Sequence, residues 1–184
     1  MKLQQKEINE ILEKMVNLKV GDIGRACDLL WLGLGEDIDY IDYKGRTSKK
    51  SEYALHLQCP WRIKNAEGRI VVASYDMYEP NSTIEWFEDF DWDIQGNNLY
   101  DEKIEIWFKE KDRFVIAYEL QTDLDLIVTF DDGNSLEIFM NKTTDTEYWR
   151  FFNSENHVVV SGVDVHVGDK KVYAIQIAKD EFIC

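Results

Sequence analysis

The sequence predicts an α+β fold in a single domain, residues 1–184, built on a mostly antiparallel, meandering β-sheet. Three observations predict this class. Apolar residues recur with helical spacing near the N-terminus and again after residue 98. From Phe114 onward they alternate with a period of two, and short turn signals separate the alternating runs. Because short turns favour antiparallel neighbours, we expect a meander that forms a curved sheet or a partial barrel.

The first predicted element is an N-terminal amphipathic helix over residues 2–18. Its apolar positions have the spacing of one helical face: Ile8, Ile11, Leu12, Met15 and Val16. We expect this helix to cover one face of the sheet. An apolar run over residues 27–34 then predicts a strand, and a lysine-rich loop follows it over residues 44–50.

Two strands and two helices are predicted in the middle of the chain. Residues 52–63 alternate between two faces until Pro60, which should end or bend the strand, and Gly68 predicts a turn into a second strand over 69–73. A short helix is expected over 82–90. A longer helix near 98–112 begins at Asn98, whose side chain can cap it.

The rest of the chain predicts strands joined by short turns. Asp131, Asp132, Gly133 and Asn134 form a hairpin-turn signal. The predicted strands cover residues 114–120, 124–130, 136–140, 148–152, 157–161, 163–167 and 172–177.

The charge of the chain excludes several kinds of partner. With 36 acidic and 21 basic residues the net charge is −15, which argues against binding nucleic acid or an anionic membrane surface. No run approaches the roughly 18 apolar residues of a membrane span, and the N-terminus is too polar for a signal peptide. Three irregularly spaced cysteines do not resemble a disulfide framework. We therefore expect a cytoplasmic protein, and the sequence does not indicate its oligomeric state.

One segment, Ile70–Glu102, concentrates the negative charge. Its 33 residues include no lysine or arginine. They contain nine carboxylates: Asp76, Glu79, Glu85, Glu88, Asp89, Asp91, Asp93, Asp101 and Glu102. They also contain seven aromatic residues: Tyr75, Tyr78, Trp86, Phe87, Phe90, Trp92 and Tyr100. Because these rings fall partly at helical spacing, we expect many of them to face inward.

The preferred functional hypothesis is a non-enzymatic interaction protein that binds a basic protein partner. Complementary charge speeds encounter, and aromatic anchors supply affinity. Small acidic immunity proteins that neutralise cationic toxins use the same physics. The residues that we assign to partner binding are Glu85, Trp86, Glu88, Asp89, Asp91 and Trp92.

The alternative is a metal- or ligand-binding protein, including a metal-dependent hydrolase, centred on residues 91–102. This segment partly matches a helix–loop–helix calcium loop, with Asp91, Asp93 and Glu102 at ligand positions and Gly96 at the turn. Calcium is the one cofactor that the sequence suggests. The pattern departs from the motif at Gln95 and Asn98, so an acidic loop before a capped helix explains the same residues.

Other motifs point to structure more than to chemistry. In a strand, His56 and Cys59 would face opposite sides, which argues against a shared zinc ion or a nucleophilic pair. Arg62 and Arg150 each follow a tryptophan in an apolar strand, where an arginine usually pairs with a carboxylate or lies on a ring, with ligand binding as the alternative. We assign no catalytic residue.

Four segments, EYALHLQCPWRI, SYDMYEP, DWDIQGNNLYDEK and EYWRFF, resemble a family of uncharacterised bacterial proteins, a domain of unknown function. They lie within residues 52–152. The resemblance implies a compact single domain of bacterial origin. It implies no activity, and no site residue follows from it.

Overall fold

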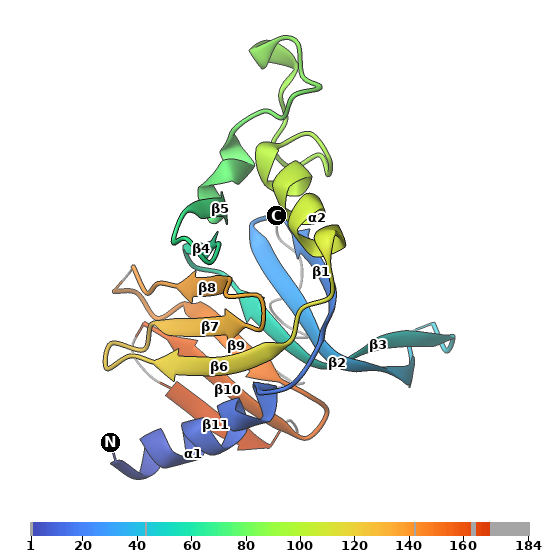
Figure 1. Cartoon of the computed structure of the whole chain (residues 1–184). Coiled ribbons are helices and arrows are strands. Elements are labelled where there is room, and N and C mark those ends of the chain that lie inside the picture. The colour runs from blue at the N-terminus through green and yellow to red at the C-terminus, as the bar shows by residue number, and fades with distance from the viewer. Residues whose placement is uncertain (1, 43, 142, 163–164, 170–184) are drawn as a thin grey trace. The chain divides into compact units, whose positions relative to one another are not determined.

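The computed structural model describes residues 2–42, 44–141, 143–162 and 165–169, and it divides the chain into two compact units. The first unit contains residues 1–58 and 142–184, and the second contains residues 59–141. Each unit has its own antiparallel sheet, and the predicted α+β class is confirmed (Figure 1). That the whole chain folds as a single domain stays a prediction.

The described part of the first unit forms a six-stranded sheet in the order β1-β2-β3-β9-β10-β11. Its strands are β1 (Val20–Ala26), β2 (Leu29–Ile41), β3 (Thr47–Leu57), β9 (Glu147–Phe152), β10 (Asn156–Ser161) and β11 (Val165–Asp169). The chain leaves this sheet after β3 and returns at β9, so the second unit is an insertion between two neighbouring strands. The predicted meander of consecutive strands is therefore correct for β1-β2-β3 and for β9-β10-β11. It did not predict that β3 pairs with β9.

The N-terminal helix is shorter than predicted. α1 covers Lys2–Leu12 and continues as a single 3₁₀ turn, η1 (Glu13–Met15). The backbone of Asn17 has a φ of 70°, outside the right-handed helical region, and the helix ends before it. The buried side chains of Leu12 and Met15 belong to the apolar face that the sequence predicted, and α1 contacts β10 and β11.

The first hairpin, β1 with β2, was not predicted from the sequence. We expected one strand over residues 27–34, but β1 and β2 pair around a turn at Cys27 and Asp28, with Ala26 opposite Leu29. Cys27 has a φ of 51°, a conformation that glycine or asparagine usually adopts in turns. Beyond Leu34, β2 and β3 continue as a two-stranded ribbon, so most of the expected lysine-rich loop is strand (Figure 1).

The described part of the second unit forms a five-stranded sheet in the order β5-β4-β8-β7-β6, together with α2 (Leu99–Glu110). Its strands are β4 (Trp61–Lys64), β5 (Ile70–Ala73), β6 (Val115–Leu120), β7 (Leu126–Phe130) and β8 (Ser135–Ile138). The predicted hairpins at Gly68 and Gly133 are confirmed. The sheet and α2 share a buried core that includes Ile63, Val128 and Trp107.

Two other predicted elements have different outcomes. The helix expected over residues 82–90 is wrong, because this segment contains only a 3₁₀ turn, η3 (Phe87–Asp89). The side chain of Asn81 accepts hydrogen bonds from the backbone N–H and the hydroxyl of Thr83, which favours a turn over a helix. The strand predicted over 172–177 lies outside the described residues. Within those residues, every helix is too short or too polar to pass through a membrane.

Candidate functional site

The most prominent irregular segment of the second unit is an acidic loop, residues 79–98, between η2 (Ser74–Tyr78) and α2. In Figure 1 it extends away from β5 and α2 toward the top of the view. Backbone hydrogen bonds close its base: Leu99 N donates to Glu79 O at 2.8 Å, and Asn81 N donates to Asn97 O at 3.0 Å. The two ends of the loop are therefore fixed to each other.

Two buried asparagines hold this base. Asn98 has no exposed surface; its Oδ1 accepts from Asp101 N at 2.8 Å and its Nδ2 donates to Trp92 O at 2.8 Å. Asn81 donates from Nδ2 to Gly96 O at 2.5 Å. The predicted N-cap of α2 is confirmed, and the same side chain also fixes the loop backbone. Neither this second role nor the contribution of Asn81 was predicted from the sequence.

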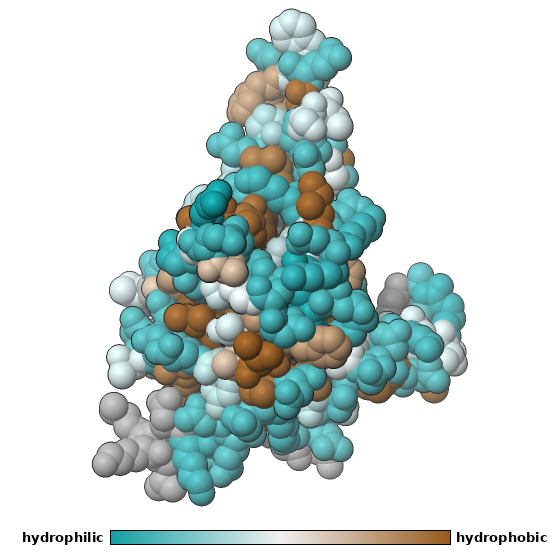
Figure 2. Space-filling model, in the orientation of Figure 1, coloured by the Kyte–Doolittle hydropathy of each residue, from teal (hydrophilic) through white to brown (hydrophobic). Residues whose placement is uncertain are grey.

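The far end of the acidic loop exposes aromatic rings. Trp86 is 66% exposed and Phe87 is 69% exposed, and the flanking Glu85 and Glu88 are exposed as well. The prediction that many rings of the segment face inward is therefore wrong: Tyr100 is buried, whereas most of the others are exposed or half-buried. At the top of the view, Figure 2 shows hydrophobic and hydrophilic residues side by side on the visible face.

The remaining residues assigned to partner binding lie on the same loop. Asp91 is exposed and Trp92 is half-buried. The side chain of Asp89 lies outside the described part of the structure. The residues assigned to partner binding thus lie close together because they are near one another in sequence, on one loop whose base is held by hydrogen bonds.

The residues assigned to a metal site have other partners in this structure. Asp91 Oδ1 accepts from the backbone N–H of Asp93, and Glu102 Oε2 accepts from the backbone N–H and the hydroxyl of Ser82 at 3.3 Å. Among the described residues, no three His, Cys, Asp or Glu side chains are grouped so that they could hold a metal ion. Calcium binding by Asp91, Asp93 and Glu102 stays a prediction from the sequence.

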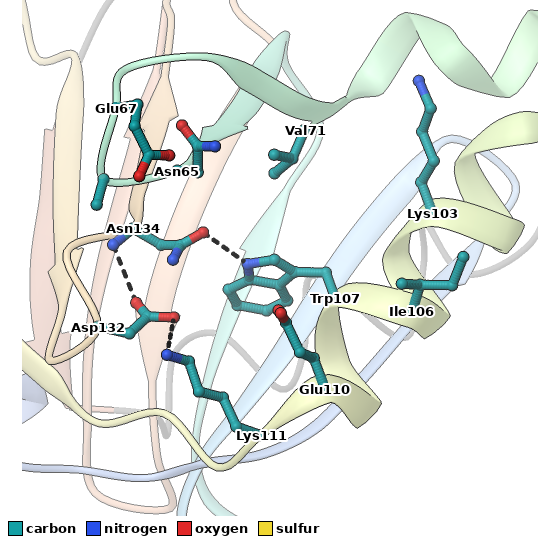
Figure 3. A pocket seen from close by; sticks show the side chains of 11 residues that line it. Asn65, Glu67, Val71, Lys103, Ile106, Trp107, Glu110, Lys111, Asp132 and Asn134 are labelled. Carbon is teal, nitrogen blue, oxygen red and sulfur yellow. Dashed lines mark hydrogen bonds and ion pairs between the residues drawn. The ribbon is translucent and has the colours of Figure 1, made fainter.

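A separate cavity of about 430 Å³ lies within the second unit, between the turns that follow β4 and β7 and the C-terminal half of α2 (Figure 3). Trp107 forms part of its wall, and its indole N–H donates to Asn134 Oδ1 at 3.2 Å. Beside it, Asp132 accepts from the backbone N–H of Asn134 and pairs with Lys111. No sequence pattern predicted this cavity.

Of the three carboxylates that line the cavity, Glu67, Glu110 and Asp132, the buried Asp132 has a structural role. Asp132 is bonded at 2.7 Å by the buried guanidinium of Arg113, which also lies over the ring of Trp107. Burial alone would raise the pKa of Asp132, but hydrogen bonds from Asn134 and Arg113 outweigh it, and the pKa lies below its ordinary value. A carboxylate that stays ionised at neutral pH suits an ion pair better than proton transfer.

The two arginines singled out in the sequence pair as expected. Arg62 donates to Glu137 at 2.6 Å. Arg150 donates to His56 Nδ1 at 3.2 and 2.9 Å and lies 3.4 Å from Glu147. Burial and the charge of Arg150 lower the pKa of His56 to about 3, so the imidazole is neutral at pH 7 and acts as a hydrogen-bond acceptor.

Comparisons of the chain with family models, with curated proteins and with solved structures found no match. The resemblance to a family of uncharacterised bacterial proteins stays a prediction from the sequence.

Proposed function

We propose that this protein is a non-enzymatic, cytoplasmic interaction protein that binds a basic protein partner through the acidic loop. One observation carries the proposal. Trp86 and Phe87 are about two-thirds exposed, within a loop whose base is fixed by backbone hydrogen bonds and buried asparagines. Two large adjacent rings in water at the end of such a loop are typical of a surface that is covered in a complex.

The charge of the loop supports a basic partner. Residues 79–98 contain six carboxylates and no lysine or arginine. Exposed like charges repel one another, so a cationic surface that approaches them relieves the repulsion and is attracted over about one Debye length, 8 Å at physiological salt. The carboxylates would thus speed encounter and select the partner, while the rings supply most of the affinity.

The fixed base of the loop also favours binding. A loop that is already ordered loses less conformational entropy when a partner covers it. Here the backbone bond between Leu99 and Glu79, and the bond from Asn98 to Trp92, remove much of that freedom in advance. The base of the loop therefore needs little further backbone ordering on binding.

Site-specific photo-crosslinking in the cells that encode the protein tests this function. A photoreactive phenylalanine analogue replaces Phe87, and a matched control carries it at Ile116, which is 51% exposed on β6 of the same unit. We expect a basic protein to be crosslinked from position 87 and not from position 116. The same products from both positions, or an acidic protein from position 87, would contradict the proposal.

A further inference from the structure

Among the described residues, one type of arginine site occurs three times. In each, a guanidinium lies over an aromatic ring and also faces a carboxylate. The three sites are Arg62 with Phe139 at 4.9 Å and Glu137, Arg113 with Trp107 at 4.3 Å and Asp132, and Arg150 with Phe152 at 5.1 Å and Glu147. Stacking on the ring and hydrogen bonding to the carboxylate use different parts of the guanidinium, so the two contacts reinforce each other.

At the base of the acidic loop the surface presents the ring and carboxylate components of such a site. The rings of Tyr75 and Tyr78 lie 6.1 Å apart, and the rings of Tyr78 and Trp92 lie 5.5 Å apart. We refer to these three residues as the aromatic row. Tyr75 is 65% exposed and Tyr78 is 46% exposed, so much of the ring surface is open to a partner.

Local structure explains why the row forms. Tyr75 and Tyr78 are three residues apart in η2, and side chains with this spacing lie one above the other in a 3₁₀ helix. Trp92 reaches them from the acidic loop, where its carbonyl accepts a hydrogen bond from the buried Asn98. The row is thus held in place before any partner arrives.

Carboxylates accompany the row, and its own segment supplies no cation. Glu79 directly follows Tyr78, and Asp91 and Asp93 flank Trp92; all three side chains are exposed. Residues 70–102 contain no lysine or arginine, and the next cation, Lys103, pairs with Asp76 at 3.1 Å. The charge around the row therefore favours a cation that comes from outside the segment.

We propose that the aromatic row binds an arginine side chain of the basic partner. The guanidinium stacks on Tyr75 and Tyr78 and donates hydrogen bonds to the neighbouring carboxylates, as Arg62 and Arg113 do at their own ring and carboxylate. This inference rests on the proposed function and adds to it a residue-level preference. Arginine is favoured over lysine, because its planar, weakly hydrated group stacks and donates at the same time.

Two synthetic peptides of equal charge, hexa-arginine and hexa-lysine, serve as probes in isothermal titration calorimetry at physiological salt. We expect the wild-type protein to bind hexa-arginine about fivefold more tightly than hexa-lysine. The variant Tyr75→Leu/Tyr78→Leu should lose this preference and keep its affinity for hexa-lysine, because its net charge is unchanged.

Two control variants make the result specific. Tyr75→Phe/Tyr78→Phe keeps both ring faces and should keep the preference for arginine. Phe114→Leu removes a ring that is 41% exposed on the same unit but away from η2 and the loop, and should also keep it. A preference that persists in Tyr75→Leu/Tyr78→Leu, or that is lost in Phe114→Leu, would overturn the inference.

The outcome is distinguishable from failure of the proposed function. If Trp86→Ala/Phe87→Ala abolishes the preference for arginine while Tyr75→Leu/Tyr78→Leu does not, the loop binds cations but the row is not the subsite, and the inference is wrong. If the preference depends on the row but no basic protein is crosslinked from position 87, the inference holds for the surface and the proposed partner class is contradicted.

Discussion

In the second unit, the carboxylates bonded to arginine and the carboxylates of the acidic loop are the same chemical group but have different partners. Asp132 is 3% exposed and bonded to Arg113, and Glu137 is bonded to both Arg62 and Lys64. In residues 79–98 the chain places six carboxylates and no cation, with Glu85 and Glu88 in water. The first group stabilises the fold, whereas the second carries its negative charge in a segment without lysine or arginine.

This difference leads to opposite expectations for mutation. Removing the partner of a buried charge or acceptor leaves that group less well compensated, and stability falls steeply. Removing an exposed carboxylate or ring from the loop should change stability by less than about 0.5 kcal/mol and affect binding instead.

The largest loss of stability is expected for Arg113→Met. Arg113 is 2% exposed and bonds Asp132, Glu110 and the carbonyl oxygen of Trp107, so its removal leaves the buried Asp132 carboxylate with only the longer ion pair to Lys111 at 3.4 Å. Breaking such a pair costs about 3 kcal/mol or more, measurable by urea denaturation. The control Lys109→Met removes an exposed pair with Glu105 and should change the free energy of unfolding by less than about 0.5 kcal/mol. Equal effects of the two variants would contradict the contrast.

A pH-dependent loss should come from His56. Its folded-state pKa of about 3 lies below the ordinary value of 6.5, so the unfolded chain takes up a proton that the folded chain does not. This contribution to stability is fully present above pH 6.5 and is lost as the pH falls toward 3. Between pH 7 and pH 5 the loss should reach about 2 kcal/mol.

The variant His56→Gln isolates this effect, because glutamine can accept from Arg150 and does not titrate. Its free energy of unfolding should fall less steeply than that of the wild type over the same pH range. Parallel pH profiles of the two proteins would show that His56 is not the group responsible.

An intermediate effect is expected for Asn98→Ala. The substitution removes the N-cap bond to Asp101 and the bond to the Trp92 carbonyl, both at 2.8 Å. Unfolding measurements should show a loss of about 1.5 kcal/mol. The neighbouring Asn97→Ala is a matched control, because the Asn97 contact at the loop base uses its backbone carbonyl. A similar loss in both variants would argue against the role of the buried amide.

The smallest effect is expected from calcium. Because Glu102 is bonded to Ser82 in this structure, about 1 mM calcium should shift the melting temperature by less than about 1 °C. A larger stabilisation that disappears in Asp91→Asn/Asp93→Asn would instead support the metal-binding alternative at Asp91, Asp93 and Glu102.

The sequence predicted the fold where local rules decide it. The alternating strands from β6 to β8, the hairpin at Gly68 and the cap at Asn98 follow from spacing and turn chemistry, which act over a few residues. It missed β1, because the turn at Cys27 has a positive φ without glycine. It was wrong about a helix over 82–90, where the side chain of Asn81 bonds Thr83 and neighbouring acidic residues repel one another.

The candidate site was predictable only in part. Composition alone located the acidic loop and the residues assigned to a partner, since charge and aromatic content are local properties. The exposure of Trp86 and Phe87 and the contact of Trp92 with Tyr78 depend on how the loop folds back on η2, which no local pattern indicates. The same holds for Arg113, whose pairing with Asp132 joins the end of α2 to the turn after β7.

Calorimetric titration of the partner crosslinked from position 87 tests the central claim most directly. The affinity is measured at about 50 and about 500 mM NaCl for the wild type and for Glu85→Gln/Glu88→Gln/Asp91→Asn. A control with the same net charge, Glu67→Gln/Glu119→Gln/Asp123→Asn, changes exposed carboxylates of the second unit outside the loop. We predict that the wild type and the control variant lose affinity for the partner at least about tenfold when salt is added. The loop variant should bind the partner weakly at both salt concentrations, and its affinity should change little with salt. Affinity that is indifferent to salt, or equal losses in both variants, would contradict the claim that the acidic loop binds a basic partner.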